Sequence, residues 1–139
     1  MDSESIGSKF RHLLAGKIKN RPLVWLWGAV PSFAVQNVGF PVAAAYNDPQ
    51  KSFDAQIETI AQFGDDGIPR MAVGGASDVT WAFGGTIKWP VGEYAMAPTA
   101  THHPANSEAE AEALSMPDDA ATAGPLPLYL VFAKKKKKN

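Results

Sequence analysis

The order of three segments in the first half of the chain constrains its fold more than any other feature. Residues 23–27 (LVWLW) are strand formers without polar alternation, typical of a strand buried on both faces. Pro49–Phe63 predicts a helix, because Asp48 can cap it and Pro49 suits its first position. Residues 68–73 predict a second strand. Strand, helix and strand in this order imply a right-handed parallel crossover, so we expect an α/β fold.

Helical periodicity predicts which parts of the helices are buried. In the helix from residue 49 to 63, the apolar residues Phe53, Ile57, Ile60 and Ala61 share one face. Shorter helices are expected at residues 8–15 before Gly16, at 107–114 after a capping box, and at 125–138 with Leu128, Val131 and Phe132 on one face. Residues 28–47 have little periodicity, and we expect a loop with one helical turn at 33–36.

Composition indicates a single soluble domain that spans residues 1–139. Apolar residues make up 45% of the chain and charged residues 19%. No apolar run approaches the roughly 18 residues of a membrane span, so we expect no membrane partner. Residues 1–10 have acids before any base and lack the hydrophobic region of a secretory signal, so we expect a cytoplasmic protein. The chain has no cysteine, which excludes a disulfide, a thiolate nucleophile and a cysteine-based zinc site.

A lysine-rich tail at residues 134–139 dominates the charge distribution. Residues 134–138 supply five of the thirteen lysines and arginines, so the rest of the chain carries eight bases against fourteen acids. An acidic body with clustered terminal lysines does not resemble a nucleic-acid-binding protein, and we expect no nucleic-acid partner. Three interpretations of the tail stay open: a solvated helix end, a basic interaction tail, or the translation of a run of A nucleotides.

Two runs of residues resemble a known family. Residues 21–26 (RPLVWL) resemble the amino-terminal signature of the uroporphyrinogen decarboxylase superfamily, and residues 83–90 (FGGTIKWP) are similar to its methyltransferase-like branch. The resemblance extends over nearly the whole chain and implies a (β/α)8 TIM barrel. It further implies decarboxylation of a tetrapyrrole carboxylate, or corrinoid-dependent methyl transfer to a thiol such as coenzyme M. Zinc and a corrinoid are the cofactors it implies for a full-length parent.

The sequence departs from this family in two places. Residues 27–31 (WGAVP) stand where the decarboxylase carries a motif with two carboxylate-binding arginines. The methyltransferases hold zinc with histidine and cysteine late in the barrel, and this chain has no cysteine. Because the carboxylate-binding arginines are missing, the resemblance favours the methyltransferase branch. It implies a small molecule or a corrinoid protein as substrate of the parent. No cofactor is assigned to this chain itself.

Length adds a further expectation. A complete barrel needs roughly 250 residues, and this chain has 139. We expect an incomplete, amino-terminal part of the barrel that is inactive alone. A part-barrel leaves sheet edges unpaired, which invites self-association.

The candidate site follows the second predicted strand. Asp78 is the candidate catalytic residue, since an acid there can accept a proton, although a local Asx-turn explains it too. Trp81 and Phe83 either form a stacking wall for a corrinoid or cover the barrel mouth. The remaining candidate ligand-binding residues are Trp27 on the first strand and four glycines that allow a close backbone approach or a bare turn: Gly74, Gly75, Gly84 and Gly85.

No metal site is predicted. His102 and His103 are adjacent and precede Pro104, which favours a turn over a metal site. Two alternatives to the methyltransferase fragment stay open: a decarboxylase relative with an altered carboxylate clamp, and a non-catalytic half-barrel that serves in binding or assembly.

Overall fold

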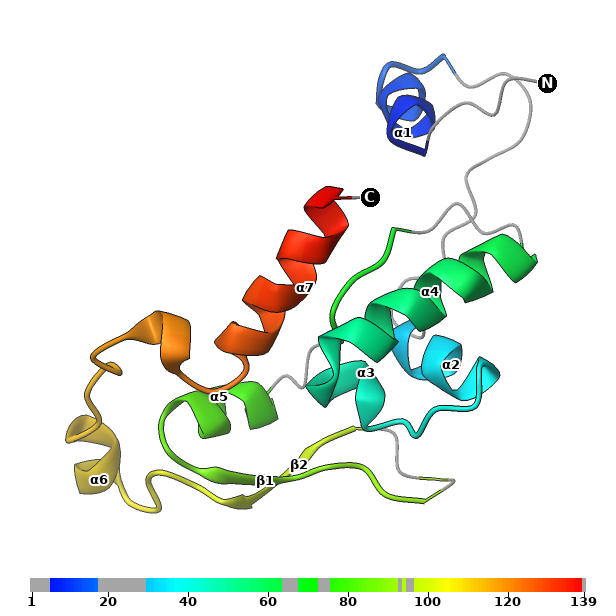
Figure 1. Cartoon of the computed structure of the whole chain (residues 1–139). Helices are drawn as coiled ribbons and strands as arrows, with labels where there is room; N and C mark the ends of the chain where they lie inside the picture. The colour runs from blue at the N-terminus through cyan, green and yellow to red at the C-terminus, as the bar shows by residue number, and fades with distance from the viewer. Residues whose placement is uncertain are drawn as a thin grey trace.

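A computed structural model describes residues 6–17, 30–63, 68–72, 76–92, 94 and 97–138. Helices dominate the described chain (Figure 1). In chain order the elements are α1 (Ile6–Leu14), α2 (Val30–Asn37), α3 (Ala44–Asn47), α4 (Pro49–Phe63), α5 (Ala76–Ala82), β1 (Thr86–Lys88), β2 (Thr99–His102), α6 (Glu108–Glu112), the 3-10 helix η1 (Ala120–Thr122) and α7 (Leu126–Lys138).

The expected α/β barrel is wrong. Across the described ranges the sheet consists of β1 and β2, which pair antiparallel with Ile87 opposite Ala100 and Lys88 opposite Thr99. Residues 68–72, expected as a parallel strand, belong to no helix or sheet. The strand expected at 23–27 lies outside the described residues. An antiparallel pair formed by a return of the chain replaces the predicted crossover.

Helix α4 has the predicted bounds, and its amino end is capped as expected. The Lys51 N–H donates to Asp48 Oδ1 at 3.0 Å, and the Lys51 ammonium lies 3.2 Å from Asp48 Oδ2. Burial raises the pKa of the Asp48 carboxyl, but the hydrogen bonds and positive charge of Lys51 outweigh burial and leave this pKa below its usual value. Asp48 therefore favours the helix in its ionised form.

The buried face of α4 differs from the predicted apolar face. Phe53 is buried as expected, but Ile57 is 45% exposed. The other buried residues are small or polar: Ser52, Ala55, Gln56 and Thr59. The face is rotated because Gln56, with no exposed surface, has backbone partners inside the fold.

Gln56 joins α4 to segment 68–72 with the pair of hydrogen bonds that a strand partner would make. Its Nε2 donates to the Arg70 carbonyl at 2.8 Å, and its Oε1 accepts from the Arg70 N–H at 2.9 Å. The same Nε2 also lies within hydrogen-bonding distance of the Ser52 carbonyl and Oγ. A side-chain amide has one donor group and one acceptor, as a backbone residue does, so it satisfies this segment without a neighbouring strand.

Two hydrophobic clusters lie on either side of this junction. The first cluster joins α2, α3, α4 and segment 68–72 through small side chains: Ala34, Val35, Ala44, Ala45, Ala55 and Ala72. The second joins α4, the same segment and α7 through Phe53, Met71 and Phe132, with the Phe53 and Phe132 rings edge-to-face at 5.5 Å. Segment 68–72 thus contributes to both clusters.

Helices α2 and α3 occupy a region expected to be mainly loop. The turn at Gly39 follows α2, with the Phe40 N–H bonded to the Val35 carbonyl at 2.7 Å and Gly39 at a φ of 84°. Asn37 then ties α2 to α4, donating to Thr59 Oγ1 at 3.3 Å and to Gln62 Oε1 at 2.7 Å. Tertiary contacts stabilise short helices whose own periodicity is weak.

The expected helix ends are largely confirmed elsewhere. Gly16 follows α1 with a φ of 66°, and Lys17 N–H closes the turn on the His12 carbonyl at 2.8 Å. Ser107 caps α6 by accepting from the Glu110 N–H at 3.3 Å. In α7, Phe132 is buried as predicted, whereas Val131 is 48% exposed.

We predict that Gln56→Ala lowers the free energy of unfolding by about 2–4 kcal/mol, because both backbone groups of Arg70 lose their partner in a water-poor environment. Urea denaturation followed by tryptophan fluorescence measures this change.

The matched control is Gln50→Ala on the exposed surface of the same helix, which we expect to change stability by less than about 0.5 kcal/mol. Equal stability of Gln56→Ala and Gln50→Ala would contradict the role of Gln56 as a strand substitute.

Candidate functional site

The predicted glycine-aromatic loop is partly helical. Asp78 and Trp81 lie on α5, and Phe83 follows its last residue. Trp27, Gly74 and Gly75 lie outside the described residues, so the candidate site is described only in part. Ser77 Oγ, buried on the same helix, donates to the Pro98 carbonyl at 2.9 Å and joins α5 to the segment before β2.

Gly84 and Gly85 terminate α5. The Gly84 N–H bonds to the Trp81 carbonyl at 3.1 Å and the Gly85 N–H to the Thr80 carbonyl at 2.8 Å, which is the Schellman arrangement. Gly84 has a φ of 88°. A Cβ on Gly85 would lie 2.6 Å from the His102 carbonyl oxygen and 2.8 Å from that of Thr80. Both glycines therefore have a structural reason: they turn the chain from α5 into β1.

Asp78 accepts a hydrogen bond from α7. The Tyr129 hydroxyl lies 2.5 Å from Asp78 Oδ2 and 3.4 Å from the Ala72 carbonyl oxygen. Burial raises the pKa of Tyr129 well above its usual value, and the Asp78 carboxylate adds to this because it accepts the phenol proton and repels a phenolate. At neutral pH the phenol is a proton donor that holds α5 and α7 together across segment 68–72.

Trp81 packs against Trp89, the residue that follows β1. Its ring lies edge-to-face with that of Trp89 at 5.5 Å, and both side chains are half-buried. Phe83, two residues after Trp81, is also half-buried. The contact explains why aromatic residues flank the turn, and the role of Trp81 and Phe83 as a ligand wall stays a prediction.

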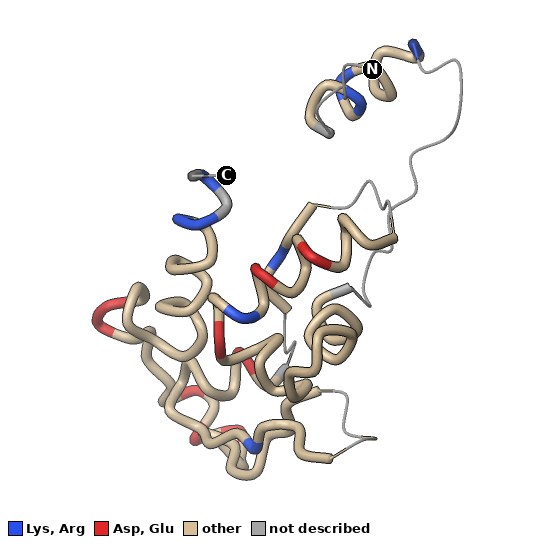
Figure 2. The backbone as a smooth tube through the Cα atoms, turned by 45° about the vertical axis from the view of Figure 1, so that its right-hand side comes forward, with Lys and Arg blue, Asp and Glu red and all other residues tan. Residues whose placement is uncertain are grey.

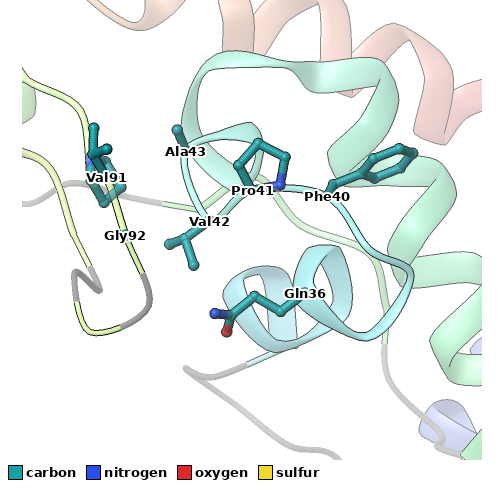
Figure 3. A pocket seen from close by; sticks show the side chains of 8 residues that line it. Gln36, Phe40, Pro41, Val42, Ala43, Val91 and Gly92 are labelled. Carbon is teal, nitrogen blue, oxygen red and sulfur yellow. The ribbon is translucent and has the colours of Figure 1, made fainter.

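A pocket lies apart from the predicted site residues that the structure describes, next to Gln36 of α2. It encloses about 350 Å³ between the chain that links α2 to α3 and the chain that follows β1 (Figure 3). Eight residues line it: Gln36, Phe40, Pro41, Val42, Ala43, Pro90, Val91 and Gly92. Figure 3 shows Gln36 and Val42 on one wall and Val91 and Gly92 on the opposite wall.

Local backbone geometry builds both walls of this pocket. Gly39 reverses the chain after α2, so that residues 40–43 return beside Gln36. Gly92, with a φ of 87°, turns the chain after Val91 on the facing wall. Val42 and Pro90 are buried, whereas Val91 is 77% exposed. The lining of the pocket therefore includes buried apolar residues and an accessible rim.

Sequence reasoning missed this pocket, because it treated residues 28–47 as loop and placed the site after residue 73. The signals that bear on it are Gly39 followed two residues later by Pro41, and Pro90 followed by Gly92. These pairs mark two turns, but their proximity depends on how α2 and β1 are arranged.

The lining of the pocket can bind a ligand through apolar contacts and hydrogen bonds to one polar side chain. None of its eight residues is charged, and the Gln36 side chain is its sole amide. A primary amide donates and accepts at once, so it can pair with an amide of a ligand. The volume lies at the low end of the range for small-molecule sites.

Two further properties concern metals and membranes. Within the described ranges, no group of three or more His, Asp or Glu side chains is placed to hold a metal ion. His102 and His103 are exposed at the end of β2. Among the helices that the structure describes, none has the length and apolar character to cross a membrane.

Comparison of the chain with protein-family models, with curated proteins and with solved structures gives no match. The resemblance to the uroporphyrinogen decarboxylase superfamily therefore stays a prediction that rests on the short runs of residues quoted above.

We predict that the Tyr129 phenol ionises well above the usual tyrosine pKa of about 10. Because its folded pKa is raised, the stability it contributes is present below the unfolded pKa and is lost as pH rises through the folded value. Absorbance titration at alkaline pH should show a late step that Tyr129→Phe removes.

Tyr94→Phe is the control, since Tyr94 is 88% exposed and its removal should leave the late step in place. A late step that persists in Tyr129→Phe would show that another group produces it.

We further predict that Gly85→Ala destabilises the fold by about 2–3 kcal/mol, because its Cβ meets two backbone carbonyls that cannot both move away. In Gly84→Ala the added Cβ has no atom within 4 Å, so only the positive φ of this residue opposes the substitution. We expect it to lower the free energy of unfolding by about 1 kcal/mol. Thermal unfolding of the two variants compares these costs, and a Gly85→Ala protein as stable as the wild type would contradict the close approach.

Proposed function

We propose that this chain is a small binding module, and that the pocket between residues 36–43 and 90–92 takes an apolar side chain of a peptide-like ligand. The observation that supports this proposal is the pocket itself. Two segments about fifty residues apart in sequence form an apolar cavity of about 350 Å³ with an accessible rim.

The chemistry of the lining defines the ligand class. Phe40, Pro41, Val42 and Val91 offer apolar surface, and the Gln36 amide can donate to a carbonyl while it accepts from an N–H. An apolar amino-acid side chain attached to a peptide unit matches both features. Burial of an apolar side chain of this size supplies about 1.5–3 kcal/mol, so the affinity of one such contact is modest.

The partners of Asp78 favour binding over catalysis by this residue. Its Oδ2 accepts a 2.5 Å hydrogen bond from Tyr129, whose raised pKa makes the phenol a poor acid. This pair stabilises the packing of α7, and a carboxylate used in this way is a weaker general base than one directed at a ligand. Asp78 therefore has a structural role, and the proposed binding function does not involve this residue.

Methyl transfer by a corrinoid-dependent parent remains a prediction from the sequence alone. It required a barrel whose strands carry the site at their carboxyl ends, and the described chain has helices and one antiparallel pair instead. A binding module agrees with the non-catalytic alternative that the sequence left open, but not with the half-barrel fold expected for it.

We predict that N-acetyl-leucinamide binds to this pocket and shifts the NMR signals of the Gln36 side-chain amide and the Gly92 N–H. Val91→Glu should weaken this binding by at least about tenfold, because it places a charge at the apolar rim and adds a desolvation cost.

The matched control is Val79→Glu, which introduces the same charge at a residue that is 61% exposed on α5 and does not line the pocket. Equal affinities of the two variants, or ligand shifts confined to other residues, would refute the proposed site. N-acetylglycinamide tests whether the side chain is required, and equal binding of both amides would also refute it.

A further inference from the structure

One face of α7 packs against the protein. The buried Phe132 contacts Phe53 of α4, and the Tyr129 hydroxyl donates to Asp78 of α5. Leu128 packs with Tyr129 against the same cluster. These three residues fix which side of the helix faces inward, and the remaining side is directed to solvent (Figure 1).

The outward side of α7 carries an apolar row. Leu126 is 38% exposed, and Leu130 and Val131 are each 48% exposed. Leu126 and Leu130 are spaced i, i+4 and therefore share one face of the helix, and Val131 lies at the flank of this face. A single exposed leucine is ordinary, but here two leucines in line, flanked by an exposed valine, lie away from the packed face of the helix.

Cations continue this row without a break. Lys134 follows Leu130 by four residues and Lys137 follows Lys134 by three, and both lysine side chains are exposed. Figure 2 shows the positive charge of α7 gathered at its carboxyl end. A cation in the last turn also interacts favourably with the helix dipole, so the charge does not oppose the helix.

We propose that this outward side of α7 binds an anionic phospholipid surface. Leu126, Leu130 and Val131 enter the interface between headgroups and acyl chains, while the stems of Lys134 and Lys137 lie along it and their ammonium groups contact lipid phosphates. The five lysines of residues 134–138 supply the electrostatic part. This surface binding requires no membrane-spanning helix, and it departs from the expectation of no membrane partner, which rested on the lack of such a span in the sequence.

Charge complementarity identifies the occupant. Outside residues 134–138 the chain has eight bases against fourteen acids, so this run of five consecutive lysines is its densest positive charge and attracts an anionic surface. A nucleic acid would account for the lysines but not for the apolar row beside them, since phosphate contacts need no leucine or valine. A lipid surface accounts for both.

The test is flotation of the full chain with vesicles of phosphatidylcholine alone and of phosphatidylcholine mixed with phosphatidylserine. We expect binding to the mixed vesicles only, weakened by added salt because the lysine contribution is screened. Replacing all five lysines of residues 134–138 by glutamine should weaken binding by at least about 100-fold, and Leu130→Ser with Val131→Ser by about tenfold.

Two matched controls separate this surface from general charge and apolarity. Lys17→Gln with Lys88→Gln removes cations elsewhere, and Val79→Ser with Met116→Ser removes exposed apolar side chains elsewhere. We expect both to bind mixed vesicles within about twofold of the wild type, since neither touches α7. Circular dichroism confirms that each variant is folded before it is compared.

Three results would overturn the proposal. The first is no binding of the wild type to mixed vesicles, and the second is wild-type binding by the five-lysine variant. The third is tighter binding to single-stranded polyuridine than to mixed vesicles at the same salt, unaffected by Leu130→Ser with Val131→Ser. That last result would identify the lysines as a nucleic-acid arm.

Discussion

The hydrogen bonds between the Gln56 amide and the backbone of Arg70 are the contact on which the rest of the structure depends. They hold segment 68–72 against α4, and this segment places Ala72 in one hydrophobic cluster and Met71 in the other. A buried amide with all its groups satisfied is directional, whereas apolar contacts are not. The amide therefore determines the position of the segment, and the clusters contribute most of the burial.

From this junction the structure extends in two directions with different consequences. Toward α2 and α3, small alanine side chains allow the helices to approach closely, and the turn at Gly39 forms one wall of the pocket. Toward α7, Phe132 and Tyr129 fix one side of the helix and leave the other side outward. The proposed ligand pocket and the proposed lipid surface thus lie on separate parts of the fold and can be tested independently.

Sequence patterns predicted the helices well where the signal is local. The Asp48 cap and Pro49 gave the start of α4, Ser107 gave that of α6, and Gly16 marked the turn after α1. The predicted strand at residues 68–73 and the barrel were wrong, because an apolar segment can be satisfied by a side-chain amide as well as by a strand. Periodicity also misplaced the buried face of α4, since it gives no weight to a buried glutamine.

The sequence by itself determined the caps, the glycine turns and the run of lysines at the end of α7, because each depends on residues close together in the chain. Only the tertiary structure decided that Asp78 lies against Tyr129 and that residues 36–43 face residues 90–92. These are contacts across about fifty residues, and their partners follow from how the helices pack. The candidate glycines near α5 show the same division: sequence indicated a turn, and packing against the His102 carbonyl explained why Gly85 must lack a side chain.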